Sequence, residues 1–306
     1  MHKKDYRIGL MGLGRMGANM ARRLREEGFA LTSLYDIDRE KSKNLAAELK
    51  CHVAATPAGL AQEANTILTV VTDDAAMRGI FSETDSSRLL QFAKDRLFIN
   101  CATLSPDIHV EIETLVNQYG GETLEACMAS SIPQAREGTL YLMCGGKRAV
   151  FDDAEVLLKS LASTIRYIGT AGEAAKVKAL VNMVMNMNTA ALAEGLGLGA
   201  CMGFDVGLLR EVFSQTGAAS RVLETDGPDM QDQDHECYFS AAHAAKDSGI
   251  ALKLAERQGL KLPLAEATFA QYRRLIDLGV GEWDKSAISE LTFPGRGNER
   301  NSPDTD

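Results

Sequence analysis

The segment YRIGLMGLGRMGANMARRL, residues 6–24, decides the fold. A short apolar stretch leads into the glycine-rich turn Gly12-Leu13-Gly14-Arg15-Met16-Gly17, and apolar residues at helical spacing follow. Gly12 permits a tight turn, Gly14 lets the backbone approach a pyrophosphate, and Gly17 lets the helix pack close to the strand. The order of strand, glycine turn and helix predicts a dinucleotide site at a helix N-terminus. The alternative is a glycine turn that binds nothing.

An acidic residue follows the next predicted strand at the distance that a dinucleotide fold requires. The stretch LTSLYD ends at Asp36, about twenty residues after Gly17. A carboxylate at this point bonds the free ribose hydroxyls of NAD and repels the 2′-phosphate of NADP. Arg39 lies three residues later and could turn toward such a phosphate or remain a solvated charge. NAD is therefore the predicted cofactor, and NADP stays open.

Strand-like segments then alternate with helical ones. They cover residues 66–74, 96–106, 123–130, 139–146 and 163–169. This order predicts an α/β fold with a Rossmann-type, doubly wound and largely parallel sheet, which binds ligands at the carboxyl ends of its strands. Val71, Thr72 and Thr103 lie at two such ends and are candidates to contact the cofactor. A simple strand-to-loop turn is the alternative at each position.

The second half of the chain has a different pattern. From residue 171 to about residue 291 the apolar residues follow helical spacing, without strand alternation. We predict a Rossmann domain over residues 1–169 and an all-helical substrate and oligomerisation domain over residues 170–292. A long interdomain helix over about residues 173–203 joins them, and residues 293–306 form a loose polar tail.

Two lysines open that long helix, and helical geometry separates them. Positions two apart lie on nearly opposite sides of a helix, whereas positions four apart lie almost one above the other. Asn182 therefore shares a face with Lys178 and not with Lys176. Lys178 is the candidate catalytic lysine. A solvated lysine beside a surface asparagine is the alternative, because lysine is usually exposed.

Composition excludes several classes of function. The 306 residues are 45% hydrophobic with a net charge of −9, and no long basic stretch indicates a nucleic-acid partner. No run approaches the roughly 18 apolar residues of a membrane span, and the start lacks a signal-peptide core, so we expect a cytoplasmic protein. The six cysteines are widely spaced, which favours reduced, buried thiols over a disulfide framework or a metal site. The expected partner is a small molecule.

Five segments together resemble the β-hydroxyacid dehydrogenase family, which includes 3-hydroxyisobutyrate dehydrogenase and tartronate semialdehyde reductase. The resemblance covers about residues 6–292. The segments are GLMGLGRMG (9–17), CATLSP (101–106), GTLYLMCGG (138–146), GEAAKVKALVN (172–182) and HAAKDSGIAL (243–252). It implies a nicotinamide-dependent oxidoreductase that acts on a small 3-hydroxy acid or its semialdehyde and assembles as a homodimer or homotetramer.

The resemblance also implies roles for single residues. Lys178 matches the catalytic lysine, Asn182 the substrate-orienting asparagine, and Lys246 a lysine near the nicotinamide. Thr103 and the Val71-Thr72 pair match cofactor contacts, although family members commonly carry Leu-Pro at the pair. A lysine suits the chemistry because burial disfavours its charge and lets it exchange a proton with the substrate oxygen.

One segment departs from the family pattern. The family usually reads Asp-Ala-Pro-Val-Ser-Gly-Gly where this chain reads Glu-Ala-Cys-Met-Ala-Ser-Ser over residues 125–131. In the family that turn grips the substrate carboxylate through a hydroxyl and backbone amides. Ser130 and Ser131 could still donate hydrogen bonds to substrate, or they could merely fill a turn.

Two other readings of the same architecture remain. Imine reductases are similar, but their lysine position usually carries another residue. Some relatives keep the dinucleotide fold as a non-catalytic scaffold and lose the lysine. The presence of Lys178 argues against both readings.

Overall fold

The computed structural model describes residues 2–82 and 89–296. The chain divides between Lys178 and Ala179 into two compact units, which we describe one at a time. Most of the predicted tail, residues 297–306, lies outside the described residues. Its first residues belong to the second unit, where Phe293 is buried and Arg296 donates a hydrogen bond of 2.6 Å to the carbonyl oxygen of Met230.

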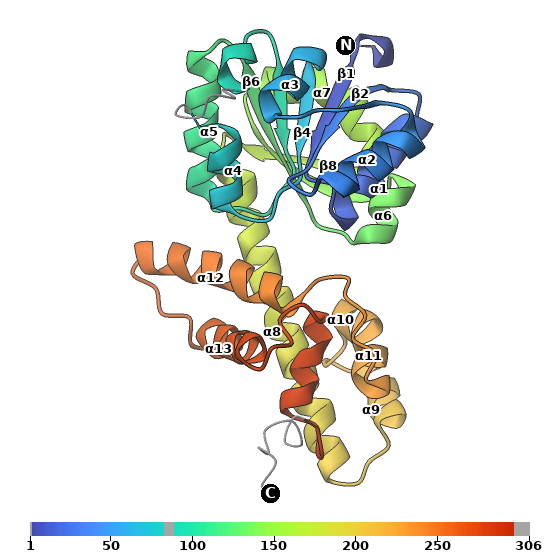
Figure 1. The fold of residues 1–306 in the computed structure, drawn as a ribbon. Coiled ribbons are helices and arrows are strands. Elements are labelled where there is room, and N and C mark those ends of the chain that lie inside the picture. The colour runs from blue at the N-terminus through green and yellow to red at the C-terminus, as the bar shows by residue number, and fades with distance from the viewer. Residues whose placement is uncertain (1, 83–88, 297–306) are drawn as a thin grey trace, which may run out of the picture. The chain divides into compact units, whose positions relative to one another are not determined.

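The first unit is built on one sheet of eight strands in the order β3-β2-β1-β4-β5-β6-β7-β8 (Figure 1). Every neighbouring pair is parallel except β6 and β7. The strands are β1 (Arg7–Met11), β2 (Ala30–Tyr35), β3 (His52–Val53), β4 (Thr66–Thr69), β5 (Leu97–Asn100), β6 (Glu122–Met128), β7 (Leu140–Gly146) and β8 (Ala162–Gly169).

Helices lie on both faces of this sheet (Figure 1). They are α1 (Arg15–Glu26), α2 (Arg39–Leu49), α3 (Pro57–Glu63), α4 (Asp74–Ile80), α5 (Pro106–Gln118), α6 (Ile132–Glu137) and α7 (Arg148–Leu161). Two short 3-10 helices, η1 (Lys3–Asp5) and η2 (Leu89–Phe92), complete the unit.

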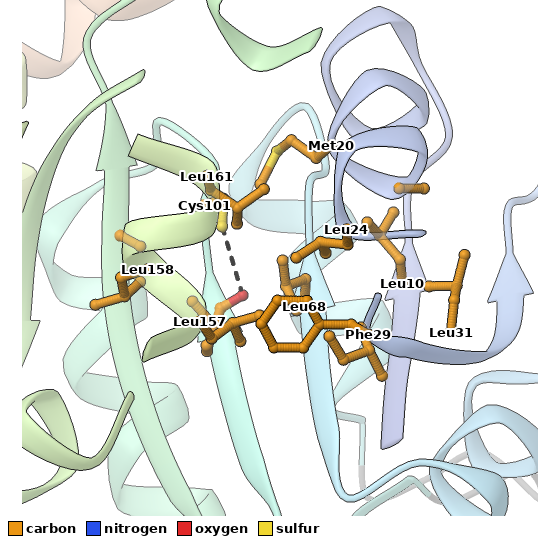
Figure 2. Packing of buried hydrophobic residues seen from close by; sticks show 14 of the residues in the cluster. Leu10, Met20, Leu24, Phe29, Leu31, Leu68, Cys101, Leu157, Leu158 and Leu161 are labelled. Atoms are coloured by element: carbon orange, nitrogen blue, oxygen red, sulfur yellow. Dashed lines mark hydrogen bonds between the residues drawn. The ribbon is translucent and has the colours of Figure 1, made fainter. Parts of the chain in front are cut away.

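Two hydrophobic cores fill the space between the sheet and its helices. Adjacent residues of β1 belong to different cores, because successive strand side chains point to opposite faces. Leu10 packs with Leu24 of α1 and Leu157 of α7, as Figure 2 shows. Met11 packs in the other core with residues of α3 and α5. This two-sided burial is what a doubly wound sheet requires.

The predicted fold class is confirmed, with differences in detail. The segments predicted over residues 66–74 and 96–106 form strands only as far as Thr69 and Asn100. Loops at the carboxyl edge follow, and the last residue of each segment, Asp74 and Pro106, already begins a helix. β7 reverses direction relative to β6, which the alternation pattern did not predict. The six cysteines are free thiols, as predicted, but only Cys101, Cys127 and Cys144 are buried. Cys51 and Cys237 are partly exposed and Cys201 is exposed, so burial was wrongly predicted for these three.

The second unit is helical. Helix α8 (Glu173–Cys201) starts in the first unit and continues into the second, followed by α9 (Val206–Ser214), α10 (Arg221–Thr225), α11 (Gly227–Asp232), α12 (Ala241–Arg257), α13 (Pro263–Asp277) and the 3-10 helix η3 (Lys285–Leu291). Leu196, Tyr272 and Ile288 lie in its core. Among the described residues, the only β pairing beyond β8 is an isolated bridge between Ser240 and Asp284. None of the described helices is long and apolar enough to cross a bilayer.

Candidate active site

The glycine turn follows β1 and leads directly into α1, and two of its glycines are required by the protein's own packing. Gly12 has a φ of +89°, a left-handed conformation that favours glycine, and a Cβ there would overlap the carbonyl oxygen of Val70. A Cβ on Gly17 would overlap the carbonyl oxygen of Gly12. The first close approach packs the turn against the end of β4, and the second holds α1 close to the end of β1.

Gly14 differs from these two glycines, because its position is open. Nothing lies within 4 Å of the Cβ that a larger residue would add, and its φ of −65° is accessible to any residue. Gly14 is the N-cap of α1, so the open space adjoins the unpaired N–H groups of the helix start. An open, Cβ-free approach to a helix N-terminus fits a dinucleotide pyrophosphate. Of the other turn residues, Leu13 is buried, Arg15 is exposed and Met16 is partly buried.

Asp36 lies directly after β2 and bonds to the glycine turn. Its Oδ2 accepts a hydrogen bond of 2.6 Å from the Leu13 N–H, and its Oδ1 accepts one of 2.8 Å from the Asp38 N–H. The carboxylate therefore ties the ends of β1 and β2 together while keeping further lone pairs. Arg39 is the first residue of α2, and its guanidinium donates to the carbonyl oxygen of Ala55 at 3.3 Å.

The remaining cofactor candidates of the first unit lie at the same edge of the sheet. Val71 and Thr72 follow β4, which lies next to β1 in the sheet. Thr103 follows β5, the next strand after β4. The Thr72 hydroxyl donates to a carboxylate oxygen of Asp73 at 3.0 Å. Since β1, β2, β4 and β5 are parallel, their carboxyl ends bring the glycine turn, Asp36 and these residues to one edge.

Ser130 and Ser131 follow β6, and both hydroxyls have local partners. The Ser130 hydroxyl oxygen accepts a hydrogen bond of 3.0 Å from the Tyr141 N–H. The N–H and the hydroxyl of Ser131, the N-cap of α6, both donate to Oε1 of Gln134, at 3.1 and 2.7 Å. Both residues remain partly exposed. Each serine thus stabilises its own turn, whatever else it contacts.

The two lysines at the start of α8 have opposite environments. Lys176 is exposed and forms an ion pair of 2.7 Å with Glu173, one turn earlier. Lys178 is only 7% exposed. A buried lysine is rare in proteins and needs a structural or chemical reason, whereas an exposed, ion-paired lysine does not.

Glu125 of β6 holds the start of α8. Its two carboxylate oxygens accept hydrogen bonds from the N–H groups of Gly172 and Ala175, the latter at 3.0 Å. Burial raises the pKa of this carboxyl group to about 7, although the two N–H donors act in the opposite direction. The role of Glu125 was not predicted, because only the fold brings β6 to the first turn of α8.

Asn182 and Lys246 are brought together in the second unit by a third residue. The Asn182 side-chain amide donates to Oδ2 of Asp247 at 2.5 Å, and the Lys246 ammonium pairs with Oδ1 of the same carboxylate at 2.9 Å. Asn182 and Asp247 are each 1% exposed. The sequence showed Asp247 only as the neighbour of Lys246; its contact with α8 is tertiary and leaves no local signal.

A row of polar side chains extends along the same face of α8. Asn186, four residues after Asn182, donates to the Ala244 carbonyl and the Ser248 hydroxyl of α12, both at 3.0 Å. Its neighbour on that face, Thr189, donates to Asp226 at 2.9 Å. Buried polar groups that are paired in this way fix one arrangement of the helices.

Comparison with known proteins agrees with this architecture. Residues 7–169 match the family model described as the NAD binding domain of 6-phosphogluconate dehydrogenase, and residues 172–292 match the model described as NAD-binding of NADP-dependent 3-hydroxyisobutyrate dehydrogenase. The fold and the glycine turn thus define a nicotinamide-dinucleotide-binding protein of the dehydrogenase class. More specifically, the chain belongs to the β-hydroxyacid dehydrogenase family.

Two curated relatives and one solved structure match this chain over most of their own length. The chain is 26% identical to the mitochondrial 3-hydroxyisobutyrate dehydrogenase of Drosophila melanogaster, over 93% of this chain and 88% of that protein. It is also 26% identical to glyoxylate/succinic semialdehyde reductase 1 of Arabidopsis thaliana, over 92% and 97%. A crystal structure of a 3-hydroxyisobutyrate dehydrogenase from Salmonella typhimurium has the same fold, with a TM-score of 0.83 at 23% identity over 93% and 99%.

Proposed function

We propose that the protein transfers a hydride between a nicotinamide cofactor and a small 3-hydroxy acid or its semialdehyde, with Lys178 as the general acid/base. The observation that carries the proposal is the burial of Lys178 at 7% exposure, next to an exposed and ion-paired Lys176. The alternatives, an imine reductase and a non-catalytic scaffold, do not require a lysine here.

The residues of the first unit have defined tasks in this proposal. The glycine turn, residues 12–17, and the start of α1 hold the pyrophosphate, and Asp36 accepts hydrogen bonds from the adenosine ribose. Val71, Thr72 and Thr103 contact the cofactor from the neighbouring strand ends. Because Arg39 already donates to the Ala55 carbonyl, the Asp36 carboxylate dominates the choice and favours NAD over NADP.

The nicotinamide, when bound, accepts the hydride in oxidation and donates it in reduction. In oxidation the Lys178 amine takes the proton of the substrate hydroxyl as the C–H hydride leaves, and in reduction the Lys178 ammonium returns a proton to the carbonyl oxygen. Asn182 orients the substrate without titrating, and its own orientation is fixed by Asp247. Ser130 and Ser131 contact the substrate acid group, and Lys246 lies near the nicotinamide.

We propose further that residues 1–169 are the dinucleotide domain and residues 170–292 the substrate and oligomerisation domain of a cytoplasmic homodimer or homotetramer. Leu180, Val181 and Val184 of α8 support an oligomer, because they are 51%, 40% and 48% exposed. Exposed apolar residues grouped on one helix are typical of a surface that another subunit covers.

The decisive experiment compares the two lysines. Lys178→Ala should lower kcat about a hundredfold or more, because the general acid/base is lost, while the Kd for NAD stays nearly unchanged. Lys176→Ala is the matched control on the same helix and should retain nearly full activity. The assay uses NAD and NADP with a panel of 3-hydroxy acids and semialdehydes. Equal losses in both variants would refute the assignment of Lys178.

A further inference from the structure

Three potential metal ligands meet within the first unit. The proposed reaction gives none of them a task, although Lys178 lies close enough to act electrostatically on one of them, Cys127. They are His109 of α5 and Glu125 and Cys127 of β6. One ligand atom of each residue lies within 4.8 Å of those of the other two. Their exposed fractions are 2%, 2% and 0%, so the group is fully enclosed by protein.

His109 gives the independent indication that something is bound there. Neither of its ring nitrogens has a hydrogen-bond partner among the described residues, although both are buried. A neutral imidazole carries a lone pair on one ring nitrogen, which can bind a metal ion. A buried polar atom without a partner destabilises a protein. Such an arrangement is expected where the missing partner is a ligand.

We propose that His109, Glu125 and Cys127 bind a divalent cation of the zinc type. An imidazole, a carboxylate and a thiolate are all zinc ligands, and the thiolate disfavours magnesium and calcium, which prefer oxygen. A neutral imidazole, one carboxylate and one thiolate together balance the charge of a 2+ ion, as a buried site requires. A tetrahedral ion takes its fourth ligand from a water molecule or a backbone carbonyl.

The geometry allows this with small movements. Zinc-ligand bonds of about 2.0–2.3 Å in a tetrahedron place the ligand atoms roughly 3.3–3.8 Å apart. From the upper limit of 4.8 Å in this structure the separations must therefore shorten by up to about 1.5 Å, through rotation of the His109 and Cys127 side chains. The N–H groups of Gly172 and Ala175 hold the Glu125 carboxylate in place, and its oxygens keep further lone pairs that can bind an ion.

The ion would serve as a structural link. Through Glu125 it would join α5 and β6 to the first turn of α8, and it would stabilise the first unit whether or not Lys178 is catalytic. The spacing of the cysteines predicted no metal site, because only the fold brings His109 beside β6. Cys127 also stands where the family pattern has proline, so the thiol is a feature of this chain rather than of the pattern.

Metal content and a spectroscopic signature test the proposal without an activity assay. The full-length protein is stripped with a chelator, incubated with Zn²⁺, desalted and analysed for bound metal. We expect about one zinc ion per chain and a rise in Tm. With Co²⁺ instead, a thiolate-to-cobalt charge-transfer band should appear in the near ultraviolet. Unchanged Tm and no retained metal would overturn the proposal.

Variants locate the ion. Cys127→Ala should lose the charge-transfer band and most of the bound zinc, whereas Cys144→Ala, which removes another buried thiol of the same sheet, should keep both. His109→Ala should also lose zinc, whereas the exposed His52→Ala should not. If His109→Ala fails to fold, as judged by circular dichroism, Cys127→Ala decides alone. Zinc that persists in Cys127→Ala would place the ion elsewhere and refute the site.

Discussion

Two turns at the carboxyl edge of the same sheet meet opposite constraints. In the turn after β1, Gly12 and Gly17 have no room for a side chain, because the Val70 and Gly12 carbonyl oxygens occupy that space. In the turn after β6, there is space for the side chains of Ser130 and Ser131. Each hydroxyl forms a hydrogen bond, that of Ser130 with β7 and that of Ser131 with Gln134. Backbone packing fixes the residues of the first turn, whereas side-chain contacts can vary in the second.

This difference explains why the chain keeps one family motif and departs from another. A cofactor shared by a whole family needs one backbone shape, and glycine is the residue that provides it. A substrate that varies among members is recognised by side chains, where a change at one position need not disturb the fold. We therefore expect substitutions in the glycine turn to affect folding and cofactor binding, and substitutions in the serine turn to affect substrate choice.

Gly17→Ala should have the largest effect in this comparison. Its Cβ would overlap the carbonyl oxygen of Gly12, so the first turn of α1 must move away from β1. Overpacking of this kind costs about 1–3 kcal/mol of stability, and the displaced helix start should also bind NAD more weakly. Chemical denaturation and NAD titration measure both effects. A stability equal to wild type would mean that the turn has more freedom than the geometry indicates.

Gly14→Ala is the matched control within the same turn. Nothing lies within 4 Å of the added methyl group, so the free energy of unfolding should stay within about 0.5 kcal/mol of wild type. NAD affinity should still fall, since the methyl group occupies the space through which the pyrophosphate approaches. Unchanged NAD affinity would contradict the assignment of this turn as the phosphate site.

The contrast also shows what the sequence could predict. The glycine turn, the alternating elements and the long helix could be predicted because each depends on local spacing that repeats within a few residues. The antiparallel pairing of β7 could not, since a strand-like pattern carries no information on direction. Lys178 could be separated from Lys176 because a helix converts spacing into direction.

The partners of the candidate residues could not be predicted in the same way. Asp247 contacts Asn182 from 65 positions along the chain, and Glu125 contacts Ala175 from 50 positions. Both contacts depend on how helices and strands pack, which a spacing pattern does not contain. The hydrogen bond from Leu13 to Asp36 is a similar case, since the sequence predicted an acid at position 36 for the ribose but not its second role in the turn.

Asp36 provides the next test, which concerns the choice of cofactor and not the stability of the fold. Asp36→Asn keeps an oxygen that can accept from the Leu13 N–H while it removes the charge that repels a 2′-phosphate. The ratio of kcat/KM for NADP to that for NAD should rise roughly tenfold or more, because a hydrogen bond to a charged group contributes about 1.5–3 kcal/mol.

Asp36→Ala is the comparison variant for this residue. It removes the acceptor as well as the charge, so it should also weaken NAD binding by loosening the turn at Leu13. A wild-type enzyme that already prefers NADP would show that Arg39 controls the choice, despite its contact with Ala55.

Ser131→Gly should have the smallest effect, and it tests the second turn directly. Both Ser131 donors already bond to Gln134, so this side chain can act on a substrate mainly through its volume. Removing volume from a binding pocket changes discrimination by about 1–3 kcal/mol, and we expect a value at the low end, with bulkier acids favoured. Loss of the N-cap hydroxyl should cost only a few tenths of a kcal/mol, because glycine is itself a tolerated N-cap.

The measurement is kcat/KM for wild type, Ser131→Gly and Ser130→Ala across substrates with and without a carboxylate. A change of a hundredfold or more confined to carboxylates would mean that a Ser131 hydrogen bond, and not its size, selects the substrate. Identical ratios in all three proteins would mean that this turn does not contact the substrate, and the acid group would then be sought near Asn182 and Lys246.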